Sequence, residues 1–219
     1  MLGFSIQNLS AMEHDRRFYE IEATSGNWSV RGVAAAVCFV DREKLSFIRL
    51  KPSYSIENFC CGDEDLDDFI LHHAAAFQKH LLSVSYAFVD SNTSRVLAYC
   101  SLANDKVAIS DFKDRTEFNR FRKKRGFPNE KRLKSYPAVK FCRLGVDETA
   151  KGLRIGTAIL NFIKSMFVIN NKTGYRFLMV DAYLNAVPFY EKNGFRFMNA
   201  EDNDPHTRLM YYDLMDIVA

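Results

Sequence analysis

The sequence lacks the features that mark several specialised classes of protein. It has no run of roughly 18 apolar residues, the length that a membrane-spanning helix needs, and its first long apolar run, Val33–Val40, follows mixed-charge sequence. That run is too short for an anchor and does not read as a secretory signal. The composition, 47% hydrophobic and 26% charged over 219 residues, is globular. We therefore expect a cytoplasmic protein with no membrane partner.

Cysteine is scarce and forms no recognisable ligand set. The five cysteines are odd in number and include no C-x-x-C spacing, so the sequence predicts neither a disulfide framework nor a zinc site. His72, His73 and His80 fall on one predicted helix, where no cysteine or carboxylate completes a metal set. We expect no metal and expect the cysteines to be small apolar residues, with a redox or metal pair at Cys60 and Cys61 as the alternative.

Positive charge is modest overall but is concentrated in one segment. The chain carries a net charge of +3, whereas residues 110–137 hold ten Lys or Arg and four Asp or Glu, a net charge of +6. Phe118, Phe121 and Phe127 are interleaved with these cations, an arrangement that could neutralise phosphates and stack on exposed RNA bases. The alternative is a solvated basic helix with its phenylalanines in the core.

Hydrophobic periodicity from residue 45 onward predicts a mixed α/β sheet with helices on both faces. Residues 1–44 are an extension of uncertain status with one candidate strand at 32–40. The predicted elements are strands at 45–50, 83–90, 95–103, 138–147, 176–182, 195–200 and 207–214, and helices at 61–82 (capped by Asp63 or Asp65), 114–125, 154–168 and 186–193. The stretch from 138 to 182 is a βαβ unit, whose two strands lie parallel in one sheet.

The loop "KGLRIGT", Lys151–Thr157, joins the first strand of this unit to its helix. A helix N-terminus carries partial positive charge and free N–H groups that bind phosphate. Gly152 and Gly156 would let a ligand approach, and Lys151 and Arg154 add positive charge. The loop is neither a Walker loop nor a dinucleotide fingerprint, and by itself it fits an ordinary helix start equally well.

Two neighbouring features favour the ligand site. Gly145 interrupts the strand before the loop, which predicts a β-bulge or a close backbone approach. Tyr190 lies on the short helix that follows the next strand and ends at Gly194. An exposed strand backbone, a phosphate loop and a tyrosine from the neighbouring unit suit a phosphorylated, extended thioester.

These blocks resemble the GNAT superfamily of acetyl-CoA-dependent N-acetyltransferases, over roughly residues 45–214. The family's pyrophosphate loop, [QR]-x-x-G-x-[GA], is matched at Gly156 and loosely at Lys151, but Arg154 stands where the family usually has glycine. The family's helix A-x-x-F-Y-x-x-x-G-F is met in full by Ala186–Phe195. The blocks "FCCGDEDLDDFI", "RVLAYCSLA" and "CRLGVDETAKG" are similar to the toxins of this superfamily that pair with small antitoxins and acetylate aminoacyl-tRNA.

The resemblance implies a GNAT fold with a βαβ acetyl-CoA-binding core at 45–219, a basic insertion at about 110–137, and direct acetyl transfer to a primary amine. Tyr190 would protonate the departing CoA thiolate. The resemblance implies Asn185 as the substitute for a family asparagine that Tyr183 replaces. The implied acetyl-CoA contacts are Leu144, Gly145 and Val146 at the thioester, Lys151, Gly152, Leu153, Arg154, Ile155, Gly156 and Thr157 at the pyrophosphate, and Asn185.

The acceptor and the partners stay open at this point. The resemblance implies aminoacyl-tRNA, bound through residues 110–137, and a small antitoxin, and it leaves a homodimer open. The alternatives are a small-molecule or protein amine, or a non-catalytic acyl-CoA-binding or interaction module. Asp147, Glu148, Asp181 and Glu191 are candidate bases, although acids at such positions more often cap helices or face solvent. An α-amine, with a pKa of about 7.7, needs less help from a base than a lysine of about 10.4, which favours an α-amine acceptor.

Overall fold

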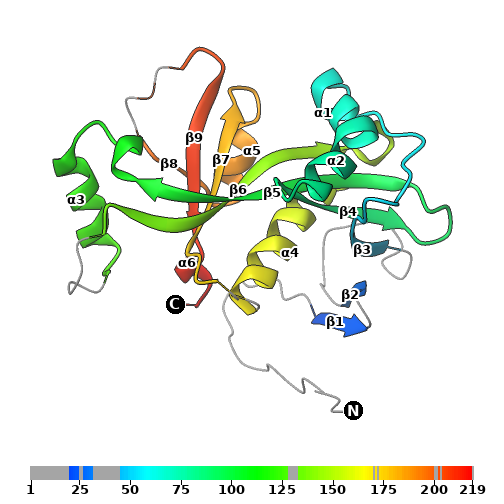
Figure 1. Ribbon diagram of the computed structural model, residues 1–219, viewed down its shortest axis with the longest axis horizontal. Coiled ribbons are helices and arrows are strands. Elements are labelled where there is room, and N and C mark those ends of the chain that lie inside the picture. Colours follow the sequence, from blue (N-terminus) through cyan, green and yellow to red (C-terminus); the bar gives the residue numbers. More distant parts are fainter. Residues whose placement is uncertain are drawn as a thin grey trace.

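The computed structural model describes residues 20–24, 27–31, 45–127, 133–169, 171, 173–199, 202 and 204–218; of residues 20–24 and 27–31 it describes only the backbone. The candidate strand at 32–40 lies outside them. Within the described residues, nine strands form one sheet in the order β1-β2-β3-β4-β5-β6-β7-β9-β8 (Figure 1). They are β1 (Glu20–Thr24), β2 (Asn27–Arg31), β3 (Leu45–Arg49), β4 (Val84–Asp90), β5 (Val96–Ala108), β6 (Ser135–Val146), β7 (Phe177–Tyr183), β8 (Arg196–Phe197) and β9 (Thr207–Asp213).

The sheet is mixed, as the sequence predicted. Strands β6 and β7 are parallel and are joined by α4 (Ile155–Ile169), whereas the other neighbouring pairs of described strands are antiparallel. The predicted βαβ unit is therefore confirmed. The strand predicted at 195–200 is much shorter, because β8 pairs with β9 only through Arg196 and Phe197.

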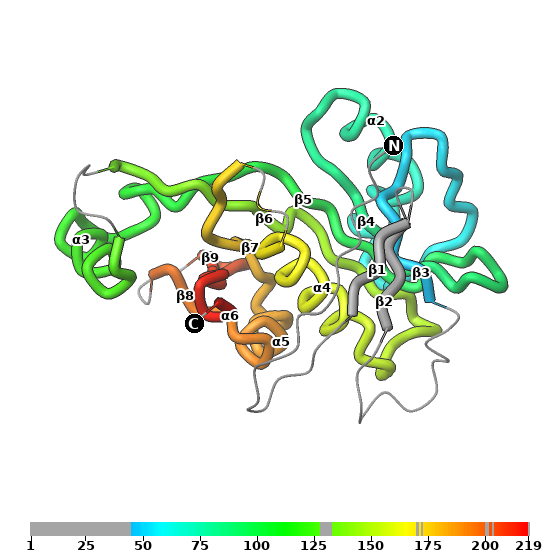
Figure 2. Tube along the Cα trace, turned by 90° about the horizontal axis from the view of Figure 1, so that it is seen from below, coloured from blue at the N-terminus to red at the C-terminus, as the bar shows by residue number. Residues whose placement is uncertain are grey.

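Helices cover both faces of the sheet. On one face lie α4 and α5 (Val187–Lys192), and on the other lies a continuous helical segment made of α1 (Glu64–Asp68), the π-helical turn η2 (Phe69–His73) and α2 (Ala74–Lys79). In Figure 2, α2 lies on one side of β4 and β5, and α4 and α5 lie on the other. Alternation along β5 divides the core accordingly: Cys100 packs on the α4 side and Tyr99 on the α1 side. The predicted α/β fold class is confirmed.

The helical segment is shorter at both ends than the predicted 61–82, and it contains a π turn. Asp63 caps it by accepting a hydrogen bond from the Leu66 N–H. The Tyr99 hydroxyl donates to the Leu66 carbonyl at 2.7 Å, and the Ala74 N–H then donates to the Phe69 carbonyl, five residues back. A side chain inserted into the helical ladder is a recognised cause of such local widening.

The basic segment forms α3 (Arg115–Lys124), which lies at the far end of the sheet from α2 (Figure 1). Its phenylalanines pack on Tyr136 and Phe177 in a separate aromatic cluster, and Phe118 is only 2% exposed. The prediction that these rings stack on RNA bases is therefore wrong for Phe118 and disfavoured for Phe121 and Phe127, which pack against the same cluster. Among the cations of α3, the exposed ones are Arg115, Arg120, Lys123 and Lys124.

One further helix and two short 3-10 turns complete the described part of the chain. The helix α6 (Met215–Val218) follows β9, and the turns are η3 (Ile109–Asp111) and η4 (Glu148–Ala150). None of the described helices is long and apolar enough to cross a membrane.

Candidate active site

The two parallel strands separate at their carboxyl ends. The pairing of β6 with β7 runs from Ala138 and Phe177 to Phe141 and Val180 and then stops, while β6 continues beside β5 to Val146. On the edge away from β6, β7 continues beside β9 to Tyr183. Carboxyl ends of strands in open α/β sheets are the usual position of ligand sites. We call the place where this pairing has ended, between residues 142–146 and 181–183, the wedge.

Strand β6 turns backbone donors into the wedge. The Asp147 N–H donates to the Leu97 carbonyl, near the start of β5, at 2.9 Å. Because successive N–H groups of a strand point to opposite edges, the N–H groups of Val146 and Leu144 point away from β5, toward the wedge. The N–H of Gly145 points toward β5. Of the three predicted thioester contacts, the geometry thus favours Leu144 and Val146 as donors.

Gly145 has a packing role, contrary to the expectation of a bulge at this position. The β-bulge in this pair of strands lies at Cys142, because Ser101 pairs with Arg143 and the next residue, Leu102, pairs with Phe141. A Cβ on Gly145 would lie 2.8 Å from the Tyr99 ring, so the close approach at Gly145 is that of a buried ring.

The loop after β6 combines a short 3-10 turn with a left-handed residue. Gly152 has a φ of +81° in open space, and Arg154 has a φ of +57°, a region that favours glycine. Arg154 thus adopts a backbone conformation that a glycine takes more easily, and its side chain is exposed. The left-handed backbone at this position is compatible with the glycine of the resembling motif.

Helix α4 begins where this loop ends. Its first backbone hydrogen bond runs from the Ala158 N–H to the Arg154 carbonyl, so the N–H groups of residues 155–157 precede the helical ladder, as at any helix start. A Cβ on Gly156 would lie 3.3 Å from both Val146 and Phe189. Gly156 therefore lets α4 approach β6 and α5, which is a packing role rather than direct room for a ligand.

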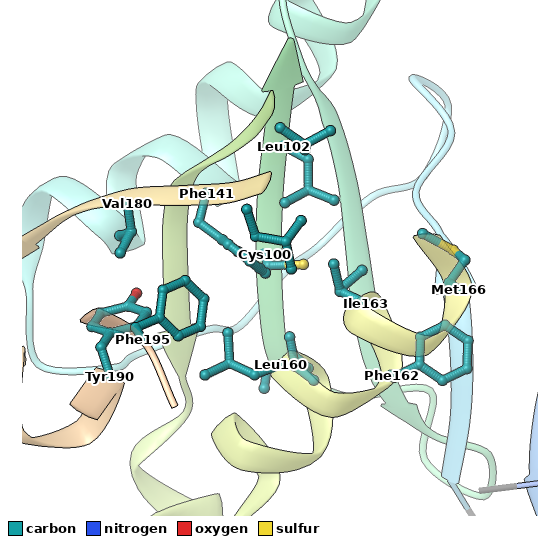
Figure 3. Packing of buried hydrophobic residues seen from close by; sticks show 14 of the residues in the cluster. Cys100, Leu102, Phe141, Leu160, Phe162, Ile163, Met166, Val180, Tyr190 and Phe195 are labelled. Carbon is teal, nitrogen blue, oxygen red and sulfur yellow. The ribbon is translucent and has the colours of Figure 1, made fainter. Parts of the chain in front are cut away.

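Tyr190 is buried on α5 beside the wedge. Its side chain is 6% exposed, and its ring packs edge to face against Phe189 and Phe195. Figure 3 shows the hydroxyl pointing toward Val180, the last β7 residue paired with β6. Burial raises the pKa of the Tyr190 phenol, and a nearby Cys100 thiol raises it further. The phenol thus remains a proton donor at any physiological pH.

A comparison with protein families matches this part of the chain. Residues 130–214 match the model of the acetyltransferase (GNAT) domain. The matched residues include the wedge, the loop and Tyr190, so this part of the chain is similar to a GNAT acetyltransferase domain. None of the curated proteins matches the chain.

Solved structures of bacterial acetyltransferase toxins share the fold. A tyrosine-to-phenylalanine mutant of KacT aligns with a TM-score of 0.64 at 20% identity, over 80% of this chain and 98% of that one. AtaT complexed with acetyl-methionyl-tRNA aligns at 0.65 and 19%, over 80% and 97%. A tyrosine-to-phenylalanine mutant of the AtaT toxin, bound to the C-terminus of the antitoxin AtaR and acetyl-CoA, aligns at 0.60 and 18%, over 80% and 96%. At these identities the likeness is one of fold.

Several of the predicted acetyl-CoA contacts lie at the surface around the start of α4. Free N–H groups at the start of α4, with the exposed Lys151 and Arg154 nearby, suit a pyrophosphate. Lys151 also pairs with Glu148 at 3.3 Å. Asn185 is exposed in the turn after β7, and Leu153 is half-buried. In the described parts of the chain, no group of three or more His, Cys, Asp or Glu is placed to hold a metal ion.

The four candidate bases lie in different surroundings. Asp147 is 1% exposed and accepts hydrogen bonds from several donors, so it is structural. Glu148 and Glu191 are exposed. Asp181 pairs with the Lys140 ammonium at 2.5 Å. Asp181 alternates along β7 with core residues of the α4 side, and so it lies on the opposite face of the sheet from Tyr190.

Sequence reasoning missed Lys164 in this domain. Lys164 lies on the buried face of α4, 5% exposed, and its ammonium donates to the Asn193 carbonyl at the end of α5. The same ammonium lies 3.9 Å from the centre of the Tyr212 ring and 5.4 Å from that of Phe195. A lysine interrupting the apolar face of a predicted helix was the available signal. Lys164 joins α4 to α5, the helix that carries Tyr190.

The buried lysine gives a pH-dependent stability. Burial lowers the pKa of Lys164 from 10.5 to about 8, so between these values the unfolded chain holds more protons than the folded one. The free energy of unfolding should therefore rise with pH through this window, by up to about 3 kcal/mol relative to Lys164→Met. Urea unfolding of both proteins at pH 7.5 and pH 10 measures the difference. Equal pH slopes in the two proteins would contradict this.

Arg154 allows strain and phosphate contact to be separated. A left-handed conformation costs a non-glycine residue about 1 kcal/mol or more, and Arg154→Gly removes this cost. The gain in stability is partly offset by the greater freedom of glycine in the unfolded chain. Arg154→Ala keeps the strain and removes the guanidinium with its aliphatic stem. If the guanidinium contacts phosphate, both variants should raise the KM for acetyl-CoA about 10-fold, and only the glycine variant should match or exceed wild-type stability. Unchanged KM values in both would mean that Arg154 faces only solvent.

Proposed function

We propose that the chain transfers an acetyl group from acetyl-CoA directly to a primary amine, and that the amine is the α-amino group of an aminoacyl-tRNA. The observation that carries the proposal is the wedge itself. Leu144 and Val146 turn N–H groups into it, Tyr190 lies on one face of the sheet, and the Lys140–Asp181 pair lies on the other. A thioester in the wedge would thus be open to an amine from one face and to a proton donor from the other.

The backbone donors would act on the thioester carbonyl. Acetyl-CoA supplies an activated acetyl group, and the N–H groups of Leu144 and Val146 would hydrogen-bond its carbonyl oxygen as negative charge develops there. Removing one such donor typically costs about 2.7 to 4 kcal/mol of barrier. This contribution belongs to the backbone and therefore does not depend on the identity of either side chain.

Tyr190 would donate to the sulfur as the C–S bond breaks. Its raised pKa makes complete proton transfer to an ordinary thiolate unfavourable. The departing sulfur would share the same apolar surroundings, however, and burial raises the pKa of the neighbouring Cys100 thiol as well. A thiolate formed there is a stronger base than in water, so a hydrogen bond from Tyr190 strengthens as the charge appears and the proton follows.

Asp181 is the acid best placed to receive a proton from the incoming amine. Although burial opposes it, the hydrogen bond and the charge of Asp181 raise the pKa of Lys140, so the ammonium persists and holds the carboxylate in place. An α-amine needs only a weak base, since much of it is already neutral near pH 7.7. An exposed carboxylate such as Asp181 is sufficient for that task.

The aminoacyl-tRNA acceptor is supported by charge and by analogy. Arg115, Arg120, Lys123 and Lys124 are exposed on α3, where they can contact phosphates. The AtaT structure holds acetyl-methionyl-tRNA, and another holds an antitoxin C-terminus with acetyl-CoA. We extend both partners, tRNA and a small antitoxin, to this chain as part of the proposal.

The test supplies purified protein with acetyl-CoA and three acceptors: charged tRNA, a free amino acid and a lysine peptide. We expect thiol release and an acetylated aminoacyl end only with charged tRNA, and a loss of tRNA binding as salt is added. Transfer to the free amino acid or the peptide alone would favour the small-molecule or protein acceptor. Acetyl-CoA binding without thiol release from any acceptor would favour a non-catalytic module.

A further inference from the structure

Asp147 is a buried carboxylate with an unusual number of partners next to the wedge. It follows Val146 directly, and its side chain is 1% exposed. It accepts hydrogen bonds from Arg95 Nη2 at 3.0 Å, from the Cys60 N–H at 3.2 Å, and from the Thr149 N–H at 3.0 Å. The Thr149 hydroxyl donates to it as well.

These donors come from three separate segments. Arg95 precedes β5, Cys60 lies just before α1, and Thr149 lies in the 3-10 turn η4 that opens the loop. The Glu148 N–H also donates to the Cys60 carbonyl at 2.8 Å. Residues 147–148 and residue 60 are therefore joined by hydrogen bonds in both directions, which fixes where the loop leaves β6.

We propose that Asp147 is a positioning residue for acetyl-CoA: it fixes residues 147–154, which lead from β6 to α4, so that the N–H groups of residues 155–157 are already in place when the pyrophosphate arrives. This inference rests on the proposed function, since it takes acetyl-CoA as the ligand. Fixing a binding loop in advance saves the entropy of ordering it on binding. The benefit therefore falls on affinity for acetyl-CoA.

The charge of Asp147 is suited to this role and not to contact with the ligand. A carboxylate facing a pyrophosphate would repel it, but the Asp147 carboxylate is enclosed by donors and paired with Arg95. Although burial opposes ionisation, the hydrogen bonds from Thr149 and Cys60 and the charge of Arg95 hold the pKa of Asp147 below its usual range. The carboxylate is thus a buried anion that holds the loop in place without facing the ligand.

The test is Asp147→Asn, which keeps the shape and removes the charge. We expect the KM and the calorimetric Kd for acetyl-CoA to rise at least 10-fold, with kcat within threefold of wild type, because the Val146 N–H and Tyr190 are left in place. Arg95→Gln serves as a milder second variant, since Arg95 is 43% exposed. It should fold and should raise the Kd by about threefold to fivefold.

Asp213→Asn is the matched control. Asp213 is also 1% exposed and also pairs with arginine, accepting from Arg176 at 2.9 Å, but it lies opposite Phe177, at the other end of β7 from the wedge. It should lose stability while keeping the wild-type Kd for acetyl-CoA. A rise in the Kd for acetyl-CoA in Asp213→Asn equal to that in Asp147→Asn would mean that general destabilisation explains the effect.

The outcomes separate this inference from the proposed function. A wild-type chain that binds no acetyl-CoA would overturn both. A wild-type chain that binds it, with an unchanged Kd in Asp147→Asn, would overturn only the role of Asp147, as would a fall in kcat without a change in KM. Should Asp147→Asn not fold, a wild-type Kd in Arg95→Gln would overturn the role.

Discussion

Tyr190→Phe should lower kcat by about 100-fold to 1,000-fold and leave the KM for acetyl-CoA within twofold of wild type. General acids typically contribute about 100-fold to 10,000-fold, and the substitution removes one hydroxyl while keeping the ring that packs against Phe189 and Phe195. Initial rates of thiol release, at saturating acetyl-CoA and acceptor, measure the effect.

The control for this prediction removes a hydroxyl elsewhere in the same core. Tyr86 packs against the cluster that holds Tyr190, but it lies on β4 and stacks on Phe47, away from α5. Tyr86→Phe should leave kcat unchanged. Wild-type turnover in Tyr190→Phe would sink the proton-donor role, whereas an equal fall in both variants would point to loss of packing.

The βαβ unit could be predicted because its signals are local. The apolar run of β7, the glycine loop and the tyrosine helix each depend on neighbours within a few residues. The Arg154 position shows both the strength and the limit of this reasoning. The motif located the residue that departs from the family pattern, but only the backbone, with a φ of +57°, shows that the arginine adopts a left-handed conformation that favours glycine.

The remaining features depend on contacts between residues far apart in the chain. The burial of Phe118 depends on the cluster that it forms with Tyr136 and Phe177, and a helical period cannot reveal these neighbours. The partners of Asp147 are Cys60 and Arg95, 87 and 52 positions away. Pairings of this kind are set by the sheet order, which the sequence pattern leaves open.

Gly145 shows how one residue can be identified correctly for an incomplete reason. The glycine marked a close approach, as predicted, but the approaching group is the Tyr99 ring on the α1 side. Tyr99 is fully buried and its hydroxyl is held by the Leu66 carbonyl, so the ring cannot easily move aside. Close packing on one face of β6 thus supports the strand whose N–H groups face the wedge.

Gly145→Ala should therefore lower the free energy of unfolding by about 2 to 3 kcal/mol, near the upper end of the range for overpacking a core. The added Cβ would lie 2.8 Å from Tyr99 and 3.2 Å from Phe59, and relief requires β6 to shift away from α1. For a domain of this size the midpoint of thermal unfolding should fall by about 4 to 12 °C. The rate of acetyl transfer should fall as well, because the same shift of β6 moves the N–H groups of Leu144 and Val146.

A second substitution tests the cause of this loss. Tyr99→Leu removes the ring atom nearest the added Cβ, and alone it should destabilise the chain through a cavity and the lost hydrogen bond to Leu66. If the ring contact is responsible, the double variant should be more stable than the sum of the two single effects by about 1 to 3 kcal/mol, as expected for residues in contact. If the losses in unfolding free energy of the two single variants simply add, the ring contact is not the cause. Gly145→Ala would then act through the backbone of residue 145 itself, and so on the wedge directly.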